Sequence, residues 1–255
     1  MKKIIKYVFV DILRNKIITG YTILLALITI GVFQLDNNSA KSMLSLLNLV
    51  LFIVPLVSII FTNIYLYNSS EFIELLVSQP LKRKKIWFSL YTSIASSFVI
   101  SFLLATGLPV LIYCNNELGY ILIGVGCMLN LIFVSLAFLV NVFTNDKAKG
   151  IGIAIFLWLY FALIFDGLVL FLLFQFADYP LEKAMLVASC FNPLDLGRIL
   201  ILLKMDVSAL MGYTGAVFKY FFGTNTGFFV AFAVLALWAI VPFIASLHKF
   251  KNKDL

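Results

Sequence analysis

Charge is scarce in this sequence. Only 12% of its 255 residues are Asp, Glu, Lys or Arg, whereas a soluble domain carries about 25%. Hydrophobic residues make up 63% of the chain. This imbalance excludes an ordinary soluble protein and indicates an integral membrane protein.

The residues that most enzymes need are also missing. His248 is the only histidine, so neither an HExxH metal site nor a Ser-His triad has its partners. No GxxxxGK[ST] sequence occurs, which excludes ATP binding by a P-loop. We therefore expect a chain that is not an enzyme and that takes any energy for transport from a partner or an ion gradient. A gradient favours several ionisable intramembrane groups, and only Asp166 qualifies.

Cysteines are few and widely separated. Cys127 falls inside an apolar stretch, where a small hydrophobic residue is the default interpretation. Cys114 and Cys190 could form a disulfide in an oxidising compartment, but the sequence does not establish one. Cys190 and its neighbouring methionines lack clustered ligand spacing, and we predict no metal site; these methionines are Met185, Met205 and Met211.

Long apolar runs dominate what is present. Six of them are near or above the roughly 20 residues needed to cross a bilayer, and in lipid each must be helical because no other open structure pairs its own backbone. They cover Ile17–Phe33, Met43–Tyr67, Ile86–Tyr113, Leu118–Phe143, Ile151–Phe176 and Thr226–Leu247. The predicted fold is a single all-α membrane domain over residues 1–255.

Lys and Arg between these runs set the orientation, because positive residues accumulate in short cytoplasmic segments. One side carries Lys2, Lys3, Lys6, Arg14, Lys16, Lys82, Arg83, Lys84, Lys85, Lys147, Lys149, Lys249, Lys251 and Lys253. The other side carries Lys41, Lys183, Arg198, Lys204 and Lys219. Both termini are therefore predicted to be cytoplasmic. Orientation and anionic lipid headgroups account for the net charge of +7 without nucleic acid.

The N-terminal segment, residues 1–16, predicts an amphipathic helix on the inner membrane face. Lys3, Tyr7, Asp11 and Arg14 fall toward water, while the apolar face toward lipid consists of Ile5, Val8, Phe9 and Ile12. The alternative is a simple extension of the first span. Asp11 and Arg14 interrupt the apolar run, which argues against a signal peptide.

A short helix is predicted between the second and third spans, over residues 68–79. Asn68 followed by Glu71 indicates its start, and Pro80 stops it at about Gln79. The helix places an apolar face beside acidic residues, which suits docking of a soluble partner; the face consists of Phe72, Leu75 and Leu76, with Glu71, Glu74 and Ser78 around it. The alternative is an interfacial helix that only anchors the loop.

Two further features concern polar residues in apolar surroundings. Asp166 stands about 22 Å along the fifth span and is expected to face protein, water or a partner, in either a structural role or a translocation path. Ser93, Ser97, Ser101 and Ala105 form a small-residue stripe for close helix packing.

The segment 177–225 is too polar to span and too apolar to lie free in water. We expect helices that dip part-way into the membrane and cap its outer mouth. Asn192-Pro193 predicts a helix start, with Asp195 near the positive end of the dipole and Arg198 within pairing distance of it. Asp206 and Gly212 follow in an Asp-x-x-Ala-Leu-x-Gly stretch.

Taken together, the entry sequence Asp11-Ile-Leu-Arg-Asn15, the loop Glu74-Leu-Leu-Val-Ser-Gln-Pro80 with the basic residues after it, and the six spans resemble an ABC type-2 permease over essentially the whole chain. The resemblance implies that residues 1–16 are an elbow helix and residues 68–79 a coupling helix. It implies contacts to a cytoplasmic ATPase that binds ATP and Mg; the residues concerned are Glu71, Phe72, Glu74, Leu75, Leu76, Gln79 and Pro80.

The outer motif, Asn-Pro-x-Asp-x-x-Arg followed by Asp-x-x-Ala-Leu-x-Gly, is similar to the permease subunits of NosDFY-type transporters, which mature nitrous oxide reductase. That resemblance implies a NosF-type ATPase, a periplasmic right-handed β-helix protein of the NosD type and a role in copper-site assembly in a bacterial inner membrane. Without an internal repeat, a two-fold pore requires a homodimer. The alternatives are a type-2 permease that exports a peptide, lipid or drug, and a membrane anchor or channel without an ATPase.

Overall fold

A computed structural model describes residues 2–35, 39–176, 182–205 and 224–252, and the described residues form helices without any strand. Within these described ranges, six helical segments are long and apolar enough to cross a membrane, which confirms the predicted spans. They run over Lys16–Leu35, Lys41–Asn68, Arg83–Tyr113, Glu117–Phe143, Lys147–Leu172 and Thr226–Lys251.

Two of the six described spans, the third and the fifth, are built from more than one element. The first, second, fourth and sixth correspond to α2 (Lys16–Leu35), α3 (Ser39–Asn68), α7 (Glu117–Phe143) and α13 (Asn225–Lys251). The third consists of α5 (Arg83–Phe102), the π-helical segment η1 (Leu103–Gly107) and α6 (Leu108–Tyr113). The fifth consists of α8 (Lys147–Leu159), the π-helical segment η2 (Tyr160–Ile164) and α9 (Phe165–Gln175).

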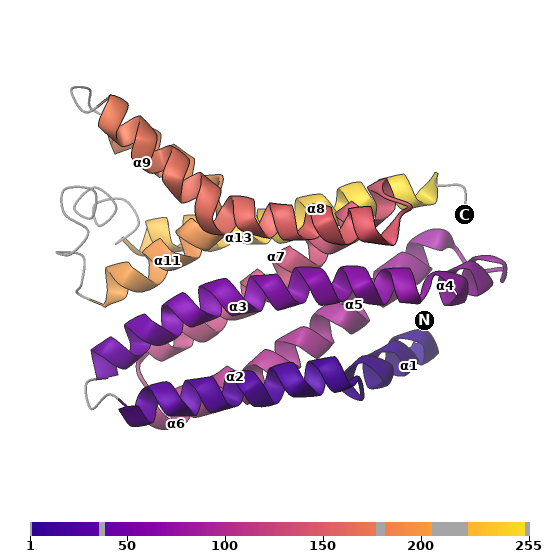
Figure 1. Ribbon diagram of the computed structural model, residues 1–255, viewed down its shortest axis with the longest axis horizontal. Helices are drawn as coiled ribbons and strands as arrows, with labels where there is room; N and C mark the ends of the chain where they lie inside the picture. Colours follow the sequence, from indigo (N-terminus) through magenta and orange to yellow (C-terminus); the bar gives the residue numbers. More distant parts are fainter. Residues whose placement is uncertain (1, 36–38, 177–181, 206–223, 253–255) are drawn as a thin grey trace.

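The remaining elements lie at the two ends of the bundle. Both chain termini lie at one end, here called the terminal end, together with α1 (Lys2–Leu13) and α4 (Ser70–Val77) (Figure 1). The opposite end, here called the far end, carries α6 and α11 (Pro193–Lys204) (Figure 1). The short α10 (Glu182–Cys190) precedes α11 in the chain.

Helix α7 is the centre of the packing and contacts α3, α5, α13 and α11. Polar side chains join it to its neighbours: Ser58 on α3 donates to Asn130 Oδ1 at 2.8 Å, and Ser135 donates to the Tyr91 hydroxyl on α5 at 3.0 Å. Gly126 allows the Phe102 ring to lie directly on its backbone, so any side chain there would collide with the ring. Hydrogen bonds of this kind and small residues are what join helices in lipid.

The amphipathic N-terminal helix forms as predicted, but its buried face has a different partner. Val8 and Ile12 are fully buried because α1 packs against α5, and Ser93 on α5 donates to the carbonyl of Ile5 at 3.2 Å. The expectation that the buried face of this helix lies against lipid is therefore wrong for Val8 and Ile12. Asp11 is exposed but accepts a hydrogen bond from the Tyr65 hydroxyl at 2.9 Å.

The small-residue stripe is a packing surface, as expected. Ser93, Ser97, Ser101 and Ala105 are all buried, on a face that includes the contact with α1. Small side chains on α5 let α1 approach it closely. The serine hydroxyls donate to backbone carbonyls of the preceding turn, as Ser97 does to the Ser93 carbonyl at 2.8 Å.

The fifth span differs from the others in shape. Figure 1 shows α9 leaving the direction of α8 at η2 and turning away from the bundle. A π-helical segment changes the backbone bonding from i+4 to i+5, which is a recognised cause of a sharp bend. The bend places Asp166, the second residue of α9, beside α11 rather than among the central helices.

Candidate functional site

Helix α4 is shorter than predicted and begins differently. It follows a turn at Ser69, whose side chain makes no cap hydrogen bond, and α3 continues up to Asn68. The expected helix start at Asn68 is therefore wrong, because the Asn68 side chain instead accepts a hydrogen bond from Lys147 Nζ at 2.7 Å. Glu71 in the first turn is favoured by the positive end of the helix dipole. The helix ends at Val77, before Pro80.

The two faces of α4 also differ from the expectation. Ile73 and Leu76 are buried against the bundle, Leu76 with 7% of its surface exposed, whereas Leu75 is 65% exposed. Leu76 therefore belongs to the internal packing and does not share a docking surface with Leu75. Phe72 is half-buried, and its ring lies 5.7 Å from the ring of Tyr7 on α1.

What remains exposed forms a compact surface, here called the α4 surface. It is defined by Glu71, Glu74, Leu75, Ser78, Gln79 and Pro80, all exposed to solvent. One large apolar side chain stands among two carboxylates, and Leu81 and Lys82 continue the exposed stretch. Such a surface can bury an apolar contact while its charges select a basic partner surface.

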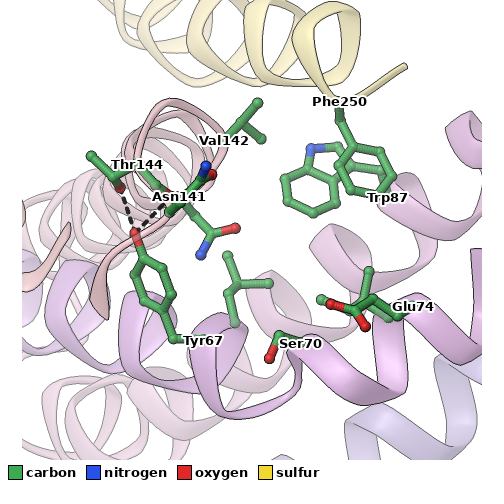
Figure 2. A pocket seen from close by; sticks show the side chains of 11 residues that line it. Tyr67, Ser70, Glu74, Trp87, Asn141, Val142, Thr144 and Phe250 are labelled. Atoms are coloured by element: carbon green, nitrogen blue, oxygen red, sulfur yellow. Dashed lines mark hydrogen bonds between the residues drawn. The ribbon is translucent and has the colours of Figure 1, made fainter. Parts of the chain in front are cut away.

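A cavity of about 330 Å³ lies directly behind α4. Its walls come from α3, α4, α5, the end of α7 and the end of α13, and Figure 2 shows Glu74 and Trp87 on one side with Tyr67 and Thr144 on the other. The Trp87 and Phe250 rings stack at 4.1 Å. The polar groups facing the space are Tyr67, Ser70, Glu74, Asn141, Thr144 and Asn145.

The chemistry of this cavity favours a positively charged or hydrogen-bond-donating group. Glu74 supplies a carboxylate, and Asn141 and Asn145 supply amide groups, whereas no Lys or Arg of the described residues contributes to its walls. Sequence reasoning assigned Glu74 to the loop surface but missed the cavity, because its other walls come from segments far apart in the chain. The only sign of the cavity in the sequence is that polar residues, such as Tyr67 and Asn141, occur at the ends of apolar spans.

One wall of the cavity connects α3 to the start of the fifth span. The Tyr67 hydroxyl donates to the Thr144 carbonyl at 3.2 Å and also contacts the Thr144 hydroxyl. The Tyr67 ring lies directly over Gly150, where any Cβ would collide with it. Asp146 caps α8 by accepting a hydrogen bond from the Lys149 backbone at 2.8 Å. The end of α3, from which the chain continues into α4, is thus joined to the start of the fifth span.

The predicted outer residues meet at the far end in an arrangement that sequence spacing only partly anticipates. Asn192 caps α11 by accepting a hydrogen bond from the Leu194 backbone at 3.0 Å, and Pro193 occupies the first turn. Arg198 lies 3.3 Å from Asp195, the expected pair, and 2.8 Å from Asp166. Asp206 and Gly212 lie outside the described residues.

Asp166 is therefore held by Arg198, a partner that sequence reasoning did not identify. The side chains of Arg198 and Asp166 are 33% and 29% exposed, so the pair is partly buried. Asp195 is the more deeply buried carboxyl, and burial raises its pKa to about 6; the nearby Asp166 carboxylate adds to the rise, and Arg198 opposes it. No sequence spacing connects residues 32 positions apart.

Two other predictions concern metals and cysteines. The described residues contain no group of three or more His, Cys, Asp or Glu side chains placed to hold a metal ion. Cys114, Cys127 and Cys190 are all free thiols.

Comparison with known proteins gives two similar sequences. The chain is 25% identical over 258 residues to "Probable ABC transporter permease protein NosY" of Stutzerimonas stutzeri, covering 93% of this chain and 86% of the relative. It is 23% identical over 223 residues to the protein of the same name from Pseudomonas aeruginosa, covering 79% of this chain and 81% of the relative. No protein-family model matches the chain.

The six spans indicate a multi-pass membrane protein, and the two relatives support a permease subunit of an ABC transporter. An ABC permease works with an ATPase, so a partner of that kind is implied. Within the class, the similarity is to NosY permeases over most of the chain, which makes this a NosY-like permease and confirms the resemblance predicted from the sequence.

Proposed function

We propose that this chain is the non-catalytic transmembrane subunit of an ABC transporter that serves copper-site maturation of nitrous oxide reductase. A separate NosF-type ATPase would bind ATP and Mg on the cytoplasmic side, and a NosD-type β-helix protein would lie on the periplasmic side. The observation that carries the proposal is the similarity to NosY permeases along 93% of the chain. The described basic residues at the terminal end support a bacterial inner-membrane protein with both termini in the cytoplasm.

The proposed contact with the ATPase is the α4 surface. Leu75 offers buried apolar area, and Glu71 and Glu74 complement basic residues of the partner. The cavity behind α4, with the Glu74 carboxylate in its wall, would receive a basic side chain. Contacts through Lys147 and Tyr67 then connect this surface to the fifth span, giving ATP hydrolysis a path to the membrane helices.

Two further parts of the proposal follow from the class. A two-fold transporter needs two copies of this chain, because the described residues hold one set of six spans. Force or substrate would then pass toward the periplasmic partner through the outer segment, residues 177–225, in which Asp195 and Arg198 organise α11.

The test is co-purification with the ATPase. Leu75→Asp and Glu74→Lys, inserted at normal levels, are expected to lower recovered ATPase at least tenfold, because they place charge at the apolar contact or reverse the complementary one. Glu117→Lys reverses an exposed charge near the far end and serves as the matched control, with normal ATPase recovery expected. Normal recovery with both α4 variants would remove the assignment of α4 as the ATPase contact.

A further inference from the structure

Helix α9 is an arm with little support of its own. Among the described elements it packs mainly on η2, the segment that joins it to α8. Its large apolar side chains are exposed along its length, including Leu168, Phe171 and Phe174. Figure 1 shows that the arm points away from the bundle beyond η2. The angle of this arm is therefore not fixed by close packing against the central helices.

Helix α11, in contrast, is embedded in the bundle. It contacts α7, α13 and α3, and most of its apolar side chains are buried. A Cβ at Gly197 would stand 2.8 Å from Val125 Cγ1 on α7, so this glycine brings the two helices into close contact. At its other end, Lys204 pairs with Glu117 at the start of α7 at 2.7 Å. Helix α11 thus provides a fixed base.

Two polar side chains tie this base to the bend. Asn192, fully buried, donates from Nδ2 to the carbonyl of Phe161 inside η2 at 2.9 Å. Arg198 donates to Asp166 Oδ2 at 2.8 Å, just beyond η2. The first bond holds the bend itself, and the second holds the arm that leaves it.

Release of the arm would not strand the arginine. Arg198 also reaches Asp195 on its own helix at 3.3 Å, so it keeps an ionic partner when Asp166 moves away. The cost of an unpaired, partly buried charge is thereby avoided. While Arg198 holds Asp166, the other carboxylate oxygen, Asp166 Oδ1, is buried and accepts no hydrogen bond from the described residues. This unpaired oxygen lowers the stability of the held state. Both features bring the held and released states close in free energy.

We propose that η2 is a hinge in the fifth span and that Arg198 is its latch: pairing with Asp166 holds α9 in place, and retreat of Arg198 to Asp195 releases it. Asn192 is the positioning residue that fixes the pivot. The device lies within this chain and does not depend on the ATPase assignment. It also gives one explanation for Asp166 and for the Asn-Pro-x-Asp-x-x-Arg sequence, which lie in different segments.

The experiment measures the angle of α9 with spin labels on the full chain in lipid nanodiscs. Labels are placed at Phe174→Cys on α9 and Ile112→Cys on α6, both highly exposed, after the native cysteines are changed to alanine. Phe174 lies about 14 Å beyond the hinge, so a rotation of about 20° moves it by about 5 Å. Double electron–electron resonance spectroscopy then measures the distribution of distances between the two spin labels.

Asp166→Asn, nearly isosteric, and Arg198→Gln are expected to broaden the distribution and add a population displaced by about 5 Å. Asp195→Asn is the matched control, since it removes the competing carboxylate and leaves the latch, so the distribution should stay narrow. The double variant Asp166→Arg with Arg198→Asp should restore the narrow distribution, which loss of folding alone would not predict. An unchanged distribution in Asp166→Asn, or equal broadening in Asp195→Asn, would overturn the proposal.

Discussion

The fourth and fifth spans have the same mean hydropathy but opposite environments within the chain. In the fourth span 72% of the most apolar window is buried, whereas in the fifth span only 11% is buried. Hydropathy therefore shows that a segment can cross the membrane and says nothing about whether it packs inside the protein. The fourth span is surrounded by helices of its own chain, and the fifth is left for lipid or another copy to cover.

Their polar residues follow the same division. Asn130 and Ser135 in the fourth span bond to neighbouring spans and fix helix packing. Asp166 in the fifth span bonds to α11 at the far end, across the bend at η2. The central span is thus joined to fixed neighbours, whereas α9, the outer part of the fifth span, is held to α11 by a side-chain contact that can be broken. Changes that act on one span and spare the other test this difference.

The largest effect is expected from matched glycine substitutions. Gly126→Leu drives a side chain into the Phe102 ring and should destabilise the protein by about 3 kcal/mol or more. Gly152→Leu in the fifth span meets nothing within 4 Å and should leave the isolated chain stable. Thermal unfolding in detergent, followed by size-exclusion chromatography, measures both. Equal melting temperatures for the two variants would contradict the division into central and peripheral spans.

A smaller loss is expected at the pivot. Asn192→Ala removes a helix cap and the bond to the Phe161 carbonyl, with an expected cost of about 2 kcal/mol. Asn116→Ala is the matched control, because Asn116 caps α7 through Gly119 at 3.1 Å, and it should cost about 1 kcal/mol. Denaturation of the two variants in the same detergent measures the difference. If Asn116→Ala costs as much as Asn192→Ala, the bond to η2 contributes no measurable stability.

The pH dependence of stability should reveal Asp195. Its pKa is raised from 3.8 to about 6, so the folded protein holds the proton more tightly than the unfolded chain does. The stability that Asp195 contributes is therefore fully present below about pH 4 and is lost as the pH rises from about 4 to about 6. We expect the melting temperature to fall by about 3 °C over this range and the fall to disappear in Asp195→Asn. A fall of the same size in that variant would assign it to other groups.

The smallest effect is expected from the ion pair between Lys204 and Glu117. The Glu117 side chain is 72% exposed, so solvent screens the pair. Glu117→Gln should change the free energy of unfolding by less than about 0.5 kcal/mol, whereas Asp166→Asn, at the partly buried pair, should cost more. Chemical denaturation of the two variants provides the comparison. A larger loss of stability in Glu117→Gln than in Asp166→Asn would contradict the expectation that the partly buried pair contributes more than the exposed one.

Much of the fold follows from the sequence, because bilayer thickness and backbone pairing leave few choices. The spans, the amphipathic start and the helix before Pro80 all follow from local pattern. The partner of a face does not: Val8 and Ile12 meet α5, where lipid was the expected partner, because the pattern shows only that a face is apolar.

The candidate site shows the same limit. Glu74 and Leu75 were identified from amphipathicity, but Leu76 is turned inward, because adjacent positions on a helix differ by about 100° and only the packing decides which is covered. The cavity and the pair between Asp166 and Arg198 join distant segments. The bend at η2 has no proline in the π-helical segment, so the sequence gives no local signal for it.

The central claim is that α4 is the contact with a cytoplasmic ATPase, and photo-cross-linking tests it most directly. A photoreactive amino acid at Leu75, which is 65% exposed, is compared with the same amino acid at Ile112 on α6, which is 76% exposed. With the NosF-type ATPase bound, the account predicts a cross-link to the ATPase from Leu75 and none from Ile112. Stable association of the ATPase with no cross-link from Leu75, or with equal cross-linking from both positions, would contradict it.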